Sequence, residues 1–230
     1  MSRPAPTLVP PPVVDDRRRP YHHGRLRDAL IDAAIEIVAE DGLERLTIRA
    51  LAERVGVSHA APQYHFADKA ALIVAVATRG FEQLGAALGE LSGGDDAAAR
   101  LMAMGRTYIE FAMANPARYR LMFATGIPSH KSDDDAFCDA AARTFGQLTD
   151  AIAAVGPGAE DEEAAGGRVH AAALFAWSAV HGAIMLQLDG TFSSLKEEEE
   201  HAAPLPPMEQ MMPALLAHVA AGLDAEVTAG

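Results

Sequence analysis

Residues 51–66 read LAERVGVSHAAPQYHF, and this stretch decides what kind of protein the rest of the chain can be. Apolar residues recur at i, i+3, i+4 and i+7 from Ile48, which predicts a helix over the first part. Thr47 is a plausible N-cap for it, and Gly56 can adopt positive φ and end it. A helix, a short glycine turn and a second helix form the helix-turn-helix arrangement, whose second helix lies in the major groove of DNA.

The second segment is rich in small residues at its leading end, His59, Ala60 and Ala61, which would let its backbone approach a duplex. Ser58 can cap this segment and donate to a phosphate. Pro62 would fall in the opening turn, where its missing N–H costs far less than in a helix interior. We therefore expect a short recognition helix over about residues 59–66.

The net charge of −13 by itself argues against nucleic-acid binding, but the charge is unevenly distributed along the chain. Residues 17–80 hold ten Lys/Arg and eight Asp/Glu, a net charge of +2. Residues 81–230 hold eight Lys/Arg and 22 Asp/Glu, a net charge of −14, and the first sixteen residues contribute −1. The pattern indicates a neutral-to-basic head on an acidic body, which leaves DNA binding open.

Several classes of function lack their sequence signatures. No apolar run is long enough for a membrane span, and the first twenty residues contain six prolines and no apolar signal core. The single cysteine, Cys138, excludes an intrachain disulfide and fits the cytoplasm. Without CxxC, HExxH, GxSxG or a phosphate-binding glycine loop, and with nine scattered histidines, we expect no enzyme, no cofactor and no metal site.

The periodicity predicts an all-α fold with a tail and two domains. Residues 1–20 are expected to form a flexible Pro/Arg-rich tail, and its Arg17–Arg19 run is either solvated or an arm that contacts DNA. Residues 21–80 form the predicted helix-turn-helix domain, and residues 81–230 form a larger helical domain. The expected helices span about 25–41, 48–55, 59–66, 68–91, 95–114, 116–124, 135–155, 163–188 and 207–223.

Three spaced features of residues 25–80 resemble the TetR (tetracycline-repressor) family of bacterial regulators. They are EDG at 40–42, LTIRALAERVGVS at 46–58, and the HF-x-DK-x-AL run from His65 to Leu72. In the body, FAWSAVHGAIMLQLDG (175–190) and NPARYRLMF (115–123) are similar to a branch of this family with a Trp-x-x-x-His-Gly signature. Here that signature consists of Trp177, His181 and Gly182.

The resemblance implies an all-helical homodimer, with an N-terminal three-helix DNA-binding domain and a larger ligand-binding and dimerisation domain. Its partners would be double-stranded DNA with a pseudo-palindromic operator and a small apolar or amphipathic effector. The family more often has tyrosine where this chain has Gln63, and a glutamine there could pair with adenine. The DNA-binding residues that it implies are Thr47 and Ser58 at phosphates, His59 and Gln63 in the groove, Tyr64 and His65 at backbone or base edges, Lys69 at a phosphate, and Arg49 and Ala60 on the same surface.

Bulky apolar residues of the middle helices are candidates for the effector site, although a Met/Phe stripe also suits an ordinary core. Trp177 and His181 share one helix face, where they either pack in the core or line an apolar cavity. Gly182 would permit close approach of a neighbouring helix, within the body or across a dimer interface. The candidate ligand-binding residues are Met104, Tyr108, Phe111, Met122, Phe123, Phe145, Trp177 and His181.

The last helix carries an apolar face that could pair with residues 163–188 of a second copy, formed by Met208, Met211, Met212, Leu215 and Leu216. Taken together, these features predict a cytoplasmic, ligand-responsive repressor that a small molecule releases from its operator. Two other interpretations stay open. One is a helical small-molecule-binding protein or enzyme with a vestigial head, and the other is an activator or structural DNA-binding protein.

Overall fold

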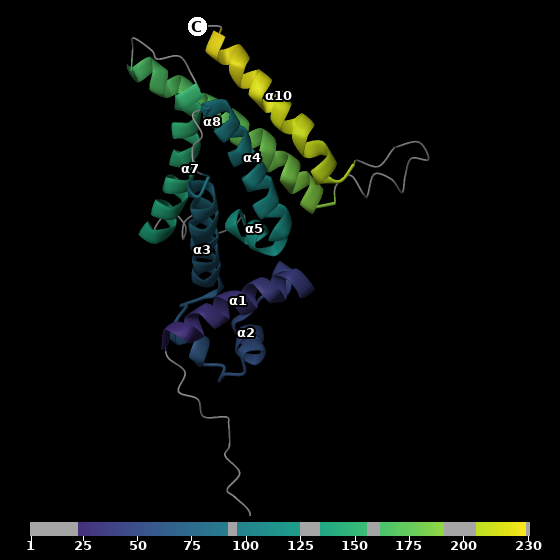
Figure 1. Ribbon diagram of the computed structural model, residues 1–230. Coiled ribbons are helices and arrows are strands. Elements are labelled where there is room, and N and C mark those ends of the chain that lie inside the picture. Colours follow the sequence, from purple (N-terminus) through teal and green to yellow (C-terminus); the bar gives the residue numbers. More distant parts are fainter. Residues whose placement is uncertain (1–22, 92–95, 125–133, 156–161, 191–205, 229–230) are drawn as a thin grey trace, which may run out of the picture.

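The computed structural model describes residues 23–91, 96–124, 134–155, 162–190 and 206–228. Every regular element in these ranges is a helix, which confirms the all-α class (Figure 1). The predicted tail, with Arg17–Arg19, lies outside the described residues. The helices form a small head made of the first part of the chain and a larger body above it.

The head begins with α1 (His23–Asp41), η1 (Leu43–Arg45) and α2 (Ile48–Val55). Thr47 caps α2, since its Oγ1 accepts a hydrogen bond from the backbone N–H of Ala50 at 3.0 Å. Gly56 ends α2 in the left-handed region, with φ 75°. Both predictions for this helix are confirmed, and the reason is local: a hydroxyl accepts at one end and a residue without Cβ turns the chain at the other.

The expected recognition α-helix over 59–66 was wrong. The structure has a single 3-10 turn, η2 (Ala61–Tyr64), in which the N–H groups of Ala61, Gln63 and His65 donate to carbonyls three residues earlier. Pro62 has no N–H, so an α-helical bond from this position is impossible and the tighter pattern forms instead. The cap position is Ala60, which provides no side-chain bond, so the expected capping role of Ser58 is not realised either.

Helix α3 (Lys69–Gly89) rises from the head into the body without a break at the predicted boundary near residue 80 (Figure 1). Asp68 caps it by accepting from the N–H of Ala71 at 2.8 Å. Its early residues Leu72 and Val76 are buried in the head core, and its late residues Leu84 and Leu88 are buried in the body. One helix therefore belongs to both domains.

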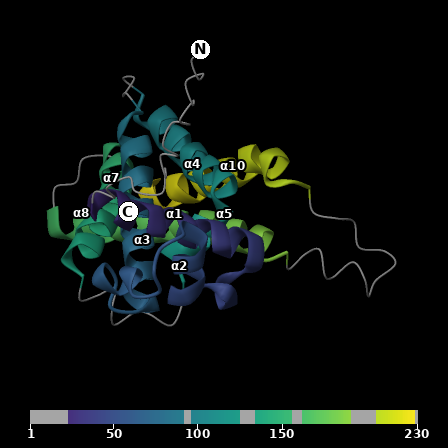
Figure 2. The ribbon, with the colours of Figure 1, turned by 90° about the horizontal axis from the view of Figure 1, so that it is seen from below.

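The body consists of α4 (Ala97–Ala114), α5 (Pro116–Met122), α7 (Asp135–Val155), α8 (Glu162–Leu188) and α10 (Met208–Thr228). α7 packs along α3, where the Thr144 hydroxyl donates to the carbonyl of Phe81 and Gln147 Nε2 donates to that of Gly85. α10 lies along α8 and α4. Figure 2, which looks from below, shows α1 and α2 nearest the viewer and the body helices behind them.

Helix α5 contributes to both cores. Ala117 and Leu121 belong to the head core, whereas Tyr119 and Met122 are buried in the body. Gly80 of α3 permits the close approach of these helices, because a Cβ built there would lie 2.6 Å from Cγ and Sδ of Met122. The two domains are therefore joined by tight packing as well as by the continuous α3.

The predicted role of the last helix needs correction. Met208, Met212 and Leu216 are buried within the same chain, in a cluster that α10 shares with α8 and α4. Since α10 folds back onto its own body, these side chains are not available to a second copy. The surface of α10 that remains exposed carries smaller residues, including Ala214, Ala217, His218 and Ala221.

Two helical stretches, Lys69–Gly89 and Ala165–Leu188, are long and apolar enough to cross a membrane by length and composition alone. Half of the most apolar part of the first is buried in the fold, as expected for the central helix of a domain. Only 28% of the corresponding part of the second is buried, so α8 presents an apolar face outward.

Candidate DNA-reading surface and ligand cavity

The nine predicted DNA-binding residues lie along one stretch that starts at Thr47 and ends at the first residue of α3. Seven of them are exposed, and His65 and Lys69 are half-buried. Tyr64 has 87% of its surface exposed, an unusual value for an aromatic side chain without a partner in the fold. These residues are therefore accessible to a duplex, and η2 presents Gln63 and Tyr64 outward.

The hydrogen-bonding groups of this surface keep donors available for phosphates. Thr47 Oγ1 is an acceptor in the cap, so its hydroxyl hydrogen can still be donated. Lys69 Nζ donates to the carbonyl of Leu43 at 2.8 Å, which uses one of its three N–H groups. Arg49 Nε bonds Glu53 Oε1 at 2.9 Å, and this bond raises the pKa of Arg49. Both partners are exposed, so a phosphate could replace the carboxylate at small cost.

Side-chain contacts hold the head rigid behind this surface. Arg54 of α2 bonds Glu40 at 2.8 Å and Glu36 at 3.4 Å, both on α1. The guanidinium of Arg27 lies 5.4 Å from the ring centre of Phe66, just after η2. The segment from α2 to η2 is thereby positioned against α1 from two sides.

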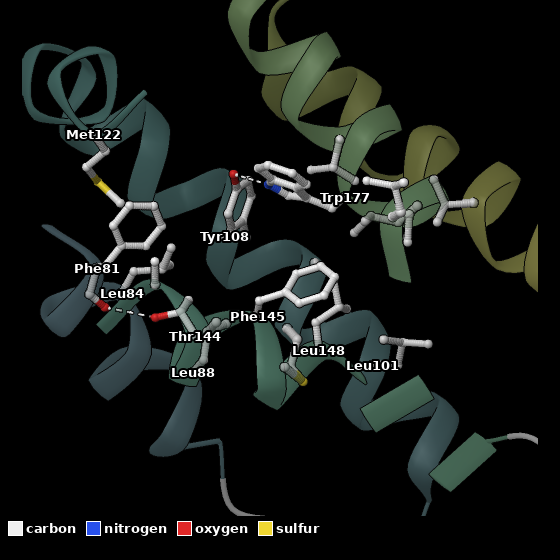
Figure 3. Close-up of a pocket in the computed structure, with 18 of the residues that line it drawn as sticks. Phe81, Leu84, Leu88, Leu101, Tyr108, Met122, Thr144, Phe145, Leu148 and Trp177 are labelled. Atoms are coloured by element: carbon white, nitrogen blue, oxygen red, sulfur yellow. Dashed lines mark hydrogen bonds between the residues drawn. The ribbon is translucent and has the colours of Figure 1, made fainter. Parts of the chain in front are cut away.

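A cavity of about 630 Å³ lies in the body among α3, α4, α5, α7, α8 and α10 (Figure 3). Six of the eight predicted ligand-binding residues line it: Met104, Tyr108, Met122, Phe123, Phe145 and Trp177. Phe111 and His181 are not part of the lining. Phe111 packs against the neighbouring apolar clusters, and His181 lies behind Tyr108 and Tyr119.

More than half of the residues in the cavity wall are not among the predicted ligand-binding residues. Leucines from several helices, among them Leu84, Leu101 and Leu148, line it together with Val180 and the α10 residues around Val219. Aliphatic residues at helical spacing look the same whether they fill a core or surround an empty volume. Only the tertiary arrangement distinguishes the two cases.

The wall of the cavity is almost entirely apolar, and none of the described residues that line it is charged. Its polar side chains are Tyr108, Thr144 and Trp177. The Thr144 hydroxyl is held by the carbonyls of Ala140 at 2.8 Å and Phe81 at 3.1 Å. Its single hydrogen is therefore already donated, and only its oxygen lone pairs are left for an occupant.

Tyr108 and Trp177 belong to a hydrogen-bonded chain of four aromatic side chains. Trp177 Nε1 donates to Tyr108 Oη at 3.0 Å, Tyr108 Oη lies 2.8 Å from Tyr119 Oη, and Tyr119 Oη lies 2.6 Å from Nδ1 of His181. Burial lowers the pKa of His181, raises that of Tyr108 to about 12, and raises that of Tyr119 further. All four groups are therefore neutral at pH 7.

Among the described residues there is no cluster of three or more His, Cys, Asp and Glu side chains arranged to hold a metal ion. The cavity and the exposed stretch of the head are therefore the candidate sites considered below.

Two models of known families match this chain. Residues 30–76 match the model for bacterial regulatory proteins of the tetR family, and residues 101–205 match the tetracyclin repressor-like C-terminal domain. The chain belongs to the TetR family. The first match covers the helix-turn-helix head, and the second covers most of the helices around the cavity.

Individual relatives show how far this similarity extends. The class C tetracycline repressor protein of Escherichia coli is 47% identical over 51 residues, which are 22% of this chain and only 23% of that protein. A solved structure from Rhodococcus sp. RHA1, of unknown function, is 28% identical with a TM-score of 0.67, over 89% of this chain and 98% of the other. A candidate regulatory protein, SCO4313, is 25% identical with a TM-score of 0.65, over 88% and 98%. This TetR-family chain is a DNA-binding transcriptional regulator.

Proposed function

We propose that this TetR-family protein is a cytoplasmic homodimeric repressor, whose two heads bind a pseudo-palindromic operator until a small apolar effector enters the cavity. The observation that carries the proposal is the position of α5. Its adjacent residues Leu121 and Met122 lie in different environments, the first in the head core and the second in the cavity wall. An occupant of the cavity therefore acts on a helix that also holds the head.

The exposed face of α8 supports the dimer. Phe175 and Leu186 have 45% and 43% of their surface exposed, and Gly182 lies between them on the same side of the helix. A Cβ at Gly182 would meet no atom of the chain within 4 Å, so its small size serves no packing inside the monomer. An apolar helix face with a glycine at its centre suits close packing against the same face of a second copy.

Effector binding in the cavity would affect DNA binding by shifting the population between two arrangements of the head. An effector that presses on Met122 favours a position of α5 in which its contacts with α3 and the head core differ. The separation of the two heads would then no longer match half-sites about 34 Å apart, or a multiple of this distance. No chemical reaction is required, only different effector affinities of the two arrangements.

Gly80→Ala should imitate the effector. The added methyl group would lie 2.6 Å from Cγ and Sδ of Met122, so the Met122 side chain, α5 or both must shift away from α3. We expect operator affinity without effector to fall about five- to twentyfold, in line with typical coupling free energies. Fluorescence anisotropy with labelled operator measures this. Gly146→Ala is the control, because its Cβ meets nothing within 4 Å. Wild-type affinity in a folded Gly80→Ala variant would contradict the proposed coupling.

Gln63→Ala and Lys69→Ala should separate base recognition from phosphate contact. The first should cost roughly 1–3 kcal/mol on the preferred operator and relax the preference at one base pair. The second should weaken binding about equally on all DNA sequences. It should also lower the slope of log affinity against log salt concentration by about one, since one fewer phosphate contact is made. Binding curves on matched and mutated operators at several salt concentrations measure both effects. If the two variants changed sequence preference alike, the assigned roles would be incorrect.

The whole proposal is tested with the purified full-length protein and the DNA upstream of its own gene. We expect a dimer by light scattering and nanomolar, strongly salt-dependent DNA binding. A monomer without salt-dependent binding to this DNA would instead support a small-molecule-binding protein with a vestigial head.

A further inference from the structure

The polarity of the cavity wall restricts the charge of an occupant. Among the described residues, the surrounding side chains include no Asp, Glu, Lys, Arg or His. The cavity is partly open to solvent, and Leu174 on its wall has 53% of its surface exposed. A carboxylate or ammonium group held inside, away from this opening, would lose its hydration and find no counter-ion on this wall, which costs several kcal/mol. The part of an occupant that lies inside must therefore be neutral, and most of its surface must be hydrocarbon.

The four-residue hydrogen-bonded chain restricts the polar group of the occupant. Trp177 Nε1 can only donate, so Tyr108 Oη accepts from it at 3.0 Å. His181 is neutral and its Nδ1 lies 2.6 Å from Tyr119 Oη. When the His181 proton is on Nε2, Tyr119 donates to Nδ1 and Tyr108 donates to Tyr119. The Trp177 N–H, the Tyr108 hydroxyl and the Tyr119 hydroxyl then each donate to an acceptor, as buried donors require.

The opposite direction is less favourable in the empty cavity. With the His181 proton on Nδ1, His181 would donate to Tyr119 and Tyr119 to Tyr108. The Tyr108 hydrogen would then have no acceptor among these partners, at a typical cost of about 1–3 kcal/mol for a buried donor. In the favoured direction, Tyr108 Oη keeps one lone pair free and acts toward the cavity as an acceptor. Tyr108 and Trp177 lie side by side on the cavity wall, joined by this hydrogen bond (Figure 3).

We infer that the cavity takes a neutral, largely hydrocarbon molecule with a hydroxyl group, which donates its hydrogen to Tyr108 Oη. The inference rests on the proposed role of the cavity as the effector site, and it adds the chemical class of the effector. Tyr119 and His181 act as positioning residues, since they hold the Tyr108 hydrogen away from the cavity. An ether or ketone of the same shape lacks the donor that this arrangement requires.

The test uses four ten-carbon probes with different head groups: decanol, decyl methyl ether, decanoate and decyltrimethylammonium. Trp177 is the only tryptophan of the chain and lines the cavity, so its fluorescence reports occupancy directly. For the full-length protein at pH 7 we expect decanol to bind about three- to tenfold tighter than the ether. Decanoate should bind about a hundredfold more weakly than decanol, because mainly its minor protonated form fits. The ammonium probe should bind more weakly still.

Two variants test the direction of the hydrogen-bonded chain. Tyr108→Phe removes the acceptor, so the ratio of decanol to ether affinity should fall to about one. Tyr119→Phe removes the nearer acceptor of the Tyr108 hydrogen and leaves only Nδ1 of His181, 3.4 Å from Tyr108 Oη. Tyr108 can then donate to the ether, whose affinity should rise until the ratio is again about one. Tyr119 is not part of the cavity lining, so a purely structural role would weaken both probes alike. Circular dichroism checks that each variant is folded.

Binding of decanoate or the ammonium probe as tightly as decanol would overturn the inference, and so would equal wild-type affinities for decanol and ether. These outcomes need only the wild-type protein, so they do not depend on the variants. DNA binding is measured separately on the upstream fragment. Selective decanol binding by a protein without DNA affinity would contradict the proposed function alone, whereas DNA binding with unselective probes would contradict this inference alone.

Discussion

Gly182→Glu should separate the dimer and lower operator affinity about a hundredfold or more. The residue lies on the exposed apolar face of α8 with no atom of its own chain near its Cβ position. In the proposed interface, two carboxylates would meet across the two-fold axis without counter-ions. A single head binds only one half-site, so loss of the dimer removes the gain in affinity that comes from two heads binding two half-sites at once. Analytical ultracentrifugation and operator titration measure the two effects.

The fold of the Gly182→Glu subunit should persist, because glutamate favours helix more than glycine does. Ala86→Glu is the matched control, since it places the same charge on an exposed position of α3. A dimeric Gly182→Glu variant with full operator affinity would exclude this face of α8 as the interface. Unfolding of both variants alike would instead indicate a general effect of the added charge.

Tyr119→Ala should lower the free energy of unfolding by about 3–5 kcal/mol, the range for removing a buried aromatic side chain. Tyr119 is completely buried, and its ring centre lies 4.9 Å from that of Phe123 and 5.6 Å from that of His181. Its hydroxyl joins Tyr108 to His181, so truncation also leaves polar groups unpaired. Urea unfolding at one fixed protein concentration measures the loss, since dimer stability depends on concentration.

Tyr64→Ala is the control for this substitution, because it removes the same side chain where 87% of its surface is exposed. We expect a change in unfolding free energy within about 0.5 kcal/mol, together with weaker operator binding. Equal destabilisation by the two substitutions would contradict the assigned positions of the tyrosines. A Tyr64→Ala variant with unchanged operator affinity would remove Tyr64 from the DNA-reading surface.

Local sequence signals predicted most of the helices correctly, since their causes are local. Thr47 begins α2 as a hydroxyl cap and Gly56 ends it with a positive φ, and both residue types can be recognised in the sequence. Pro62 is the exception. The predicted α-helix does not form there, because the missing N–H of Pro62 favours a 3-10 turn. The difference depends on a few hydrogen bonds, which residue preferences alone do not rank.

The two candidate sites also differ in how far local sequence signals could predict their residues. The predicted DNA-binding residues lie on one continuous stretch of chain, where a local motif can indicate them, and the structure leaves seven of the nine exposed. The cavity is formed by six helices from residue 81 to residue 223, and its aliphatic wall has no local signal. The apolar face of the last helix was assigned to a second copy, whereas Met208, Met212 and Leu216 are buried against the same chain.

The sequence by itself determined the helix-turn-helix head, the all-α class and the bulky apolar residues of the middle helices. Only the tertiary structure decided that these residues surround a cavity, that His181 stands behind Tyr119 instead of facing that cavity, and that α5 joins it to the head. The physical reason is that capping and periodicity act between residues a few positions apart. A cavity lined by six helices and a hydrogen-bonded chain between helices depend instead on how distant helices pack.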